Sequence, residues 1–150
     1  MDPVKTFQTM SSQPLGKFLF SKMVCQVAPY FASISPRIET LEPQRCVVTM
    51  KKRRRVTNHF KTVHAIAMCN MAELAGGMMT DASIPQGARW IPSGMSVTYL
   101  KKAKTDLTAT ADGSQVDWSR EGPTQVPVSI TDTTGEEVFH AQIEMNVKHR

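Results

Sequence analysis

The segment from Ala65 to Met79 constrains the fold most, because it is apolar almost throughout and carries a single carboxylate, Glu73. A helix that is apolar on nearly every side must be buried on most of them. We therefore predict a central helix from Val63 to about Met79, with Thr62 as its N-cap. A charge buried in such a helix costs several kcal/mol unless it is paired or able to take up a proton. Glu73 therefore needs an explanation.

The other segments predict an α+β fold. Apolar residues at helical spacing indicate an amphipathic helix from about Gln13 to Ala28, and two strands follow around the turn Leu41–Gln44. The pair Gly76-Gly77 is either a close-packing site in the central helix or its stop. Period-two patterns then indicate four strands, the first around Ser93–Ala103 and the last two forming a hairpin. This order is typical of an antiparallel sheet packed against one long helix.

Length and composition indicate one globular domain over residues 1–150, and its cysteine usage indicates a cytoplasmic location. No apolar run reaches the roughly 20 residues that a membrane span requires. Charged residues interrupt the N-terminal apolar stretch, so it is not a signal peptide. The cysteines are odd in number and far apart in sequence, which indicates free thiols in a reducing compartment. They are Cys25, Cys46 and Cys69.

Glu73 has two interpretations from the residues alone. In the first, its side chain reaches the edge of the buried region and pairs with a cation. In the second, it is a general base or nucleophile. His64 lies near the helix start, where the backbone N–H groups of Ala65 and its neighbours are free to bind a developing oxyanion. The face that carries Asn70 and Glu73 is either a seam between subunits or a cleft.

The stretch NHFKTVHAI…AELAGG resembles the signature of hotdog-fold thioesterases of the phenylacetate-degradation and 4-hydroxybenzoyl-CoA type. That signature has an Asn, a His-Gly-Gly at the start of the central helix, and an acidic residue nine positions after the His. Here Asn58 lies six residues before His64, and Glu73 lies nine after it. The stretches SVTYLKKAKTDLTATA and ITDTTGEEVFHAQIEMNV resemble two further family features, so the likeness covers about residues 33–148. It implies a hotdog fold, a curved antiparallel sheet around one long helix, preceded here by the N-terminal helix.

The resemblance implies hydrolysis of an acyl-CoA thioester, with no cofactor beyond the coenzyme A of the substrate. Glu73 would activate a water or attack the thioester directly, and the Ala65 N–H would hold the oxyanion. Asn58 would position the water or the loop. His64 would contact the carbonyl or orient the helix start, or would only cap the loop. The family's two glycines are replaced here by Ala65-Ile66. The Ala-Glu-Leu-Ala-Gly-Gly form of residues 72–77 indicates a poorly characterised branch.

The resemblance also implies an obligate homodimer or a dimer of dimers, with active sites at the subunit seam. An unpaired sheet edge is a liability, which agrees with such an assembly. The alternative function is a hotdog protein that binds an acyl-CoA or similar ligand without turnover. No membrane partner is expected.

A basic run at residues 51–55 concentrates much of the net charge of +5, and Lys101 and Lys102 belong to a second cluster. The run is a solvated loop, a clamp for coenzyme A phosphates, or a nucleic-acid surface. In the clamp, Arg53, Arg54 and Arg55 would act with Lys101 and Lys102, since guanidinium groups bind phosphate oxygens in pairs. Nucleic acid is the least favoured partner, because no aromatic residues interleave with the run. The histidines show no metal-ligand spacing, so no metal is expected.

Overall fold

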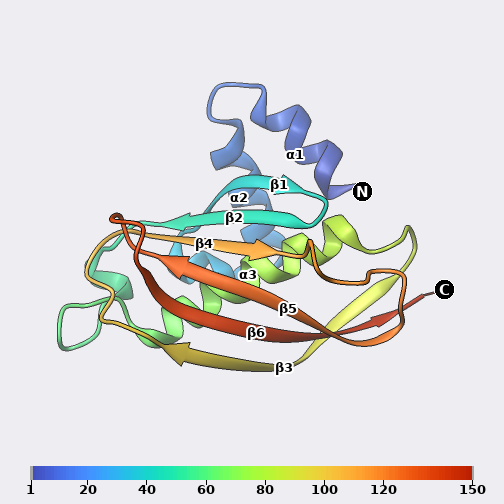
Figure 1. The fold of residues 1–150 in the computed structure, drawn as a ribbon. Coiled ribbons are helices and arrows are strands. Elements are labelled where there is room, and N and C mark those ends of the chain that lie inside the picture. The colour runs from blue at the N-terminus through green and yellow to red at the C-terminus, as the bar shows by residue number, and fades with distance from the viewer. Residues whose placement is uncertain (1, 150) are drawn as a thin grey trace.

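The computed structural model describes residues 2–149, which form two N-terminal helices, a long central helix and a six-stranded sheet (Figure 1). The α-helices are α1 (Pro3–Ser11), α2 (Gly16–Val27) and α3 (Ala65–Ser83). Two short 3-10 helices are η1 (Pro29–Ile34) and η2 (Arg54–Val56). The strands are β1 (Arg37–Glu42), β2 (Arg45–Met50), β3 (Arg89–Tyr99), β4 (Leu107–Asp112), β5 (Gly122–Thr131) and β6 (Glu137–Lys148).

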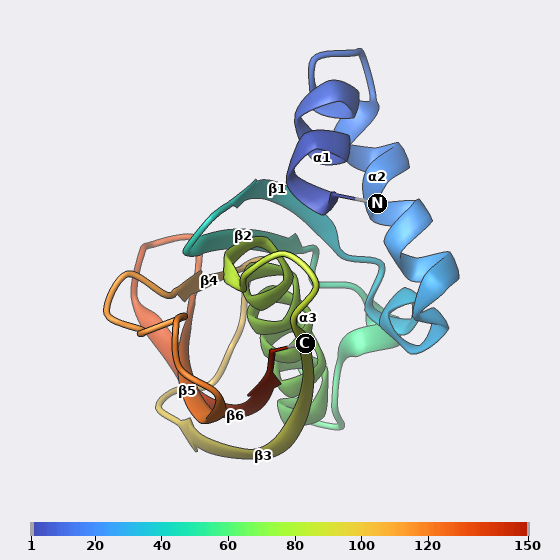
Figure 2. The same ribbon diagram turned by 90° about the vertical axis from the view of Figure 1, so that its right-hand side faces the viewer.

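The strands lie in the order β1-β2-β4-β5-β6-β3, and every neighbouring pair is antiparallel. Figure 2 shows the sheet curving around α3, with α2 and η1 on the side of the helix that the sheet leaves open. Met71, Leu74 and Met79 of α3 are buried against sheet residues such as Ile143 and Met145. The predicted arrangement of a curved antiparallel sheet around one long helix is therefore confirmed.

The start of α3 differs from the prediction because a different residue caps it. The helix begins at Ala65, and its N-cap is His64, whose Nδ1 accepts a hydrogen bond from the Ile66 N–H. Thr62, the predicted cap, is instead buried and hydrogen-bonded to Asn58. The cap is an imidazole nitrogen, which is outside the usual set of capping side chains.

The end of α3 also lies beyond the prediction, at Ser83 rather than near Met79. The glycine pair does not stop the helix. A Cβ on Gly76 would lie 3.0 Å from the Ile143 side chain, and one on Gly77 would lie 2.9 Å from the Trp90 ring. The two glycines are therefore close-packing sites against β6 and β3, and the helix continues past them.

The N-terminal region contains two helices where one was predicted. The Asp2 side chain accepts hydrogen bonds from the N–H groups of Val4 and Lys5 and so caps α1, which was not predicted. α2 begins at Gly16 rather than Gln13, because α1 turns back over it. A Cβ on Gly16 would lie 1.6 Å from the Met10 carbonyl oxygen, so only glycine fits this turn.

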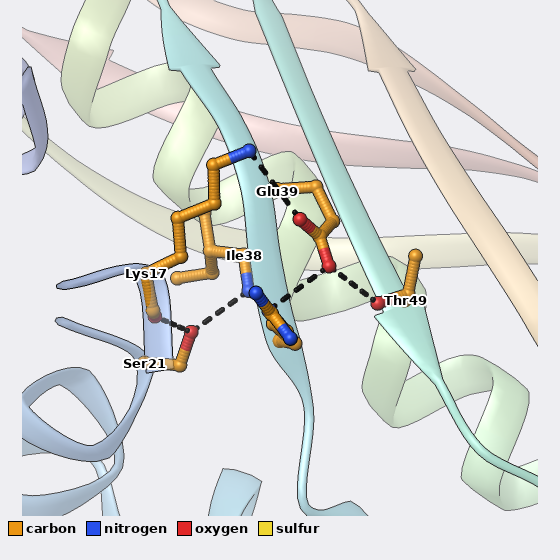
Figure 3. Close-up of polar contacts among 6 residues, drawn as sticks. Lys17, Ser21, Ile38, Glu39 and Thr49 are labelled. Atoms are coloured by element: carbon orange, nitrogen blue, oxygen red, sulfur yellow. Dashed lines mark hydrogen bonds and ion pairs between the residues drawn. The ribbon is translucent and has the colours of Figure 1, made fainter. Parts of the chain in front are cut away.

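α2 is anchored to the edge strand β1 by Ser21, as Figure 3 shows. The Ser21 hydroxyl accepts a hydrogen bond from the Ile38 N–H (2.8 Å) and donates one to the Lys17 carbonyl (2.7 Å). The Lys17 ammonium also forms an ion pair with Glu39 (3.4 Å). These contacts hold α2 in position beside α3.

At the other edge of the sheet, β3 spans Arg89–Tyr99 and not the predicted Ser93–Ala103. The strand therefore starts earlier than predicted and contains Pro92, a residue type that is excluded from central strands. An edge strand tolerates it, and the pairing with β6 shifts register between Pro92 and Gly94. Within residues 2–149, no helix combines the length and apolar character needed to cross a membrane.

Candidate functional site

A cavity of about 380 Å³ lies at the N-terminus of α3, and it collects several of the predicted site residues. The backbone from Asn58 to Ala65 forms one wall, and the chain that follows β3 forms the other. The predicted residues in its lining are Asn58, Ala65, Lys101 and Lys102, and the remaining lining residues include Phe60, Thr62, Met68 and Tyr99.

Asn58 shapes the loop in front of α3. Its Oδ1 accepts hydrogen bonds from the N–H groups of Phe60 (3.0 Å) and Thr62 (3.2 Å), and its Nδ2 donates one to the Thr62 hydroxyl (2.9 Å). Lys61 adopts a left-handed backbone conformation with φ 60°. The Asn58 carboxamide is therefore engaged in the tight turn that delivers the chain to the helix start.

The N-terminus of α3 lies at this cavity, since Ala65 is one of the lining residues. The Ile66 N–H is taken by His64 Nδ1 (3.0 Å), and the His64 N–H donates to the Val56 carbonyl (2.8 Å). The Ala65 N–H has no acceptor within the helix, as at every helix start. It lies at the positive end of the helix dipole, where developing negative charge is stabilised.

Glu73 lies in a second cavity, an apolar groove of about 380 Å³ between α2, η1, α3 and the start of β3. The groove is lined by Met23, Val24, Val27, Ala28, Phe31, Glu73, Leu74, Gly77, Met78, Asp81 and Trp90. Glu73 is half-buried, and none of the ion pairs within residues 2–149 involves it. The interpretation of Glu73 as one half of an ion pair is therefore not supported.

The two cavities do not share a lining residue. Glu73 follows Ala65 by eight residues, which places the two about 12 Å apart along the helix axis. A single chain therefore does not bring the carboxylate and the Ala65 N–H to the same reacting atom.

Asp81 is the other carboxylate of the groove, two helical turns after Glu73. Removal from water raises the pKa of Asp81, and the hydrogen bond that Trp90 Nε1 donates to its Oδ1 opposes part of that rise. The sequence analysis missed both residues. An aromatic residue at the start of the strand after the helix was visible, but its contact with Asp81 depends on how β3 packs on α3.

The predicted basic clamp is distributed over more than one surface. Lys101 forms an ion pair with Glu136, and Lys102 places its Nζ 5.8 Å from the centre of the Phe60 ring. Arg53 lines a different hollow, beside α2. Arg54 and Arg55 are exposed on η2.

The three cysteines are free, as predicted. Cys69 lies on α3 between the two cavities, with its Sγ 3.8 Å from the Tyr99 hydroxyl. Hydrogen bonding to this thiol raises the pKa of Tyr99. Within residues 2–149, no three His, Cys, Asp or Glu side chains are grouped so that they could hold a metal ion.

Comparison with solved structures identifies the fold. A structural-genomics crystal structure is 50% identical, with a TM-score of 0.88 over 99% of both chains. A thioesterase from Haemophilus influenzae is 13% identical, with a TM-score of 0.73 over 85% of this chain and 90% of that one. A thioesterase family protein from Silicibacter pomeroyi is 19% identical, with a TM-score of 0.73 over 87% and 96%. These neighbours confirm the predicted hotdog fold.

The search of curated proteins found no significant match. The family model described as "Domain of unknown function (DUF4442)" matches residues 16–147, which is most of the chain and includes α2. The protein therefore belongs to the DUF4442 family, a branch with the hotdog fold.

Proposed function

We propose that the protein is an acyl-CoA thioesterase whose active site is completed by a second copy of the chain. The observation that carries this proposal is the division of the site along α3. The carboxylate of Glu73 lies in an apolar groove. The Ala65 N–H and two lysines lie at a separate cavity, about half the length of α3 away. Two antiparallel copies of α3 would bring each groove to the partner's helix start.

Exposed groups on β3 and α3 support such a dimer. β3 is an unpaired edge, and it carries the exposed apolar side chains of Ile91, Met95 and Tyr99. Ile66, on the first turn of α3, is 55% exposed. A two-fold axis that pairs β3 with its copy would remove the open edge and cover these side chains.

In this dimer the acyl group would occupy the apolar groove. Glu73 would take a proton from a water as its oxygen attacks the thioester carbon, or would attack that carbon itself. The carbonyl oxygen would become an oxyanion and accept a hydrogen bond from the second copy's Ala65 N–H. The C–S bond would then break, and coenzyme A would leave as the thiolate. With water as the nucleophile the other product is the free acid, whereas direct attack leaves the acyl group on Glu73 as an anhydride that a water must then hydrolyse to regenerate the carboxylate.

The remaining predicted residues take supporting parts in the proposal. Lys101 and Lys102 would contact coenzyme A phosphates at the mouth of the helix-start cavity. Asn58 would hold the loop. Ile66, which replaces a family glycine, lines neither cavity, so its bulk does not fill the groove or the helix-start cavity.

Thiol release from a panel of acyl-CoA esters of increasing chain length tests the proposal. Replacing Glu73 by Gln keeps the shape of the side chain but removes the base, so kcat is expected to fall by about 100-fold or more. Asp81→Asn is the matched control, because it removes the other carboxylate of the same groove and should leave kcat within a few-fold.

Two outcomes would contradict the proposal. Full activity of Glu73→Gln would remove Glu73 as base or nucleophile. Thermal stabilisation of the wild-type protein by acyl-CoA, without thiol release from any ester, would indicate a ligand-binding protein instead.

A further inference from the structure

A third hollow, on the opposite face of α2 from the groove, carries a surplus of positive charge. It measures about 370 Å³ and lies between α2 and the first two strands. Its lining is Phe18, Lys22, Cys25, Ala32, Ser35, Pro36, Arg37, Glu39, Thr49, Lys51 and Arg53. The lining thus contains four cationic side chains and one carboxylate.

The single carboxylate is already neutralised. Glu39 accepts contacts from Arg37 Nε (3.1 Å), Lys17 Nζ (3.4 Å) and the Thr49 hydroxyl (3.3 Å), as Figure 3 shows in part. Because two cations share this one anion, the carboxylate does not offset the charge of the other lining residues.

Three cations of the hollow have no acidic partner. Among the ion pairs of residues 2–149, none involves Lys22, Lys51 or Arg53. Lys22 packs its ammonium 5.4 Å from the centre of the Phe18 ring, which holds it over the hollow. Cations that converge on a concave surface without counter-ions create a positive potential that attracts anions.

The hollow is separate from the proposed thioester site. Phe18, Lys22 and Cys25 lie on one face of α2 and line the hollow, while Met23, Val24 and Val27 lie on another face and line the groove of Glu73. The hollow shares no lining residue with the groove or with the helix-start cavity. α2 therefore forms a wall between an apolar chamber and a cationic one.

We propose that this hollow binds the phosphate groups of a small phosphorylated molecule other than the thioester substrate. Lys22, Lys51 and Arg53 bind the phosphate oxygens, with the Arg53 guanidinium able to contact two of them at once. The apolar part of the lining, Phe18 and Pro36, contacts the organic portion. This proposal does not depend on catalysis at Glu73.

Isothermal titration calorimetry with inorganic pyrophosphate and with ADP tests the proposal. Wild-type protein is expected to bind both, with an affinity that falls as salt is added. The double variant Lys51→Ala/Arg53→Ala should bind each at least about tenfold more weakly, since each lost charge-assisted hydrogen bond contributes. Arg54→Ala/Arg55→Ala is the matched control, because it removes the same charge from the same run but touches no lining residue of the hollow.

Three results would overturn the proposal. The first is that the wild-type protein binds neither probe. The second is that both double variants weaken binding equally, because this would mean a general attraction of anions to the basic run. A pyrophosphate affinity that is abolished by saturating coenzyme A would mean that the hollow belongs to the substrate. The same titrations on Glu73→Gln should match wild type, which keeps this test independent of hydrolysis.

Discussion

His64 Nδ1 accepts a hydrogen bond from the Ile66 N–H at 3.0 Å, so the histidine of the family-like signature is the N-cap of α3. This bond satisfies the Ile66 N–H. The Ala65 N–H, as the first of the helix, has no intrahelical acceptor. Of the roles that the resemblance implies for His64, the structure therefore shows the one at the helix start, which it holds in place.

Removing this cap should lower stability. His64→Ala is expected to reduce the free energy of unfolding by about 1 kcal/mol, as for other N-cap losses, measured by urea denaturation. His64→Asn supplies another acceptor for the same N–H and should recover most of that loss. Equal stability of His64→Ala and wild type would contradict the capping assignment.

The proposed division of the active site between two copies predicts complementation. Ala65→Pro should remove the oxyanion donor and leave the helix intact, because proline is favoured at the first helical position. His64, with ψ 137°, already has the extended conformation required before proline. Ala65→Pro and Glu73→Gln are each expected to be nearly inactive in thiol-release assays.

Co-expression of the two variants should restore activity. Random pairing makes half of the dimers mixed, and each mixed dimer has one intact site of two, so about a quarter of wild-type activity is expected. If Glu73 and the Ala65 N–H served the same site within one chain, every mixed dimer would be inactive. Circular dichroism of each variant checks that both remain folded.

The β3 edge is expected to be the dimer interface. Met95→Lys places a charge on this edge, and lysine on an edge strand opposes strand pairing. The variant should shift toward monomer in sedimentation velocity and lose hydrolysis in parallel. Leu15→Lys is the control, because Leu15 is also apolar and 73% exposed but lies at the α1–α2 turn. A dimeric, active Met95→Lys protein would place the interface elsewhere.

The two lysines of the helix-start cavity should differ in their effect on substrate binding. Lys101 is already paired with Glu136, whereas Lys102 lies over the Phe60 ring and takes part in none of the ion pairs within residues 2–149. Lys102→Ala is therefore expected to raise KM for acyl-CoA several-fold with kcat nearly unchanged, and Lys101→Ala should raise it less. A larger effect of Lys101→Ala would contradict this ranking.

Local pattern was enough to predict the main architecture. The apolar run around Glu73 requires burial on most sides, and alternation along the last hairpin requires one face inward. Both requirements follow from the periods of helix and strand, which do not depend on distant contacts. The spacing of Asn58, His64 and Glu73 resembles the signature of hotdog-fold thioesterases, and that resemblance indicated the hotdog fold.

An unusual helix cap and the contacts between elements decided the rest. The bounds of α3 depend on an imidazole cap and on glycines that fit against Ile143 and Trp90, and neither contact can be read from spacing. The same holds for the site. Residues of one signature lie in two cavities, because a helix converts each residue of separation into distance along its axis. The basic run is divided between surfaces, because Arg53 lies in the hollow beside α2 whereas Arg54 and Arg55 are exposed on η2. Packing of α2 and β3, and not the order of residues, determines which side chains share a cavity.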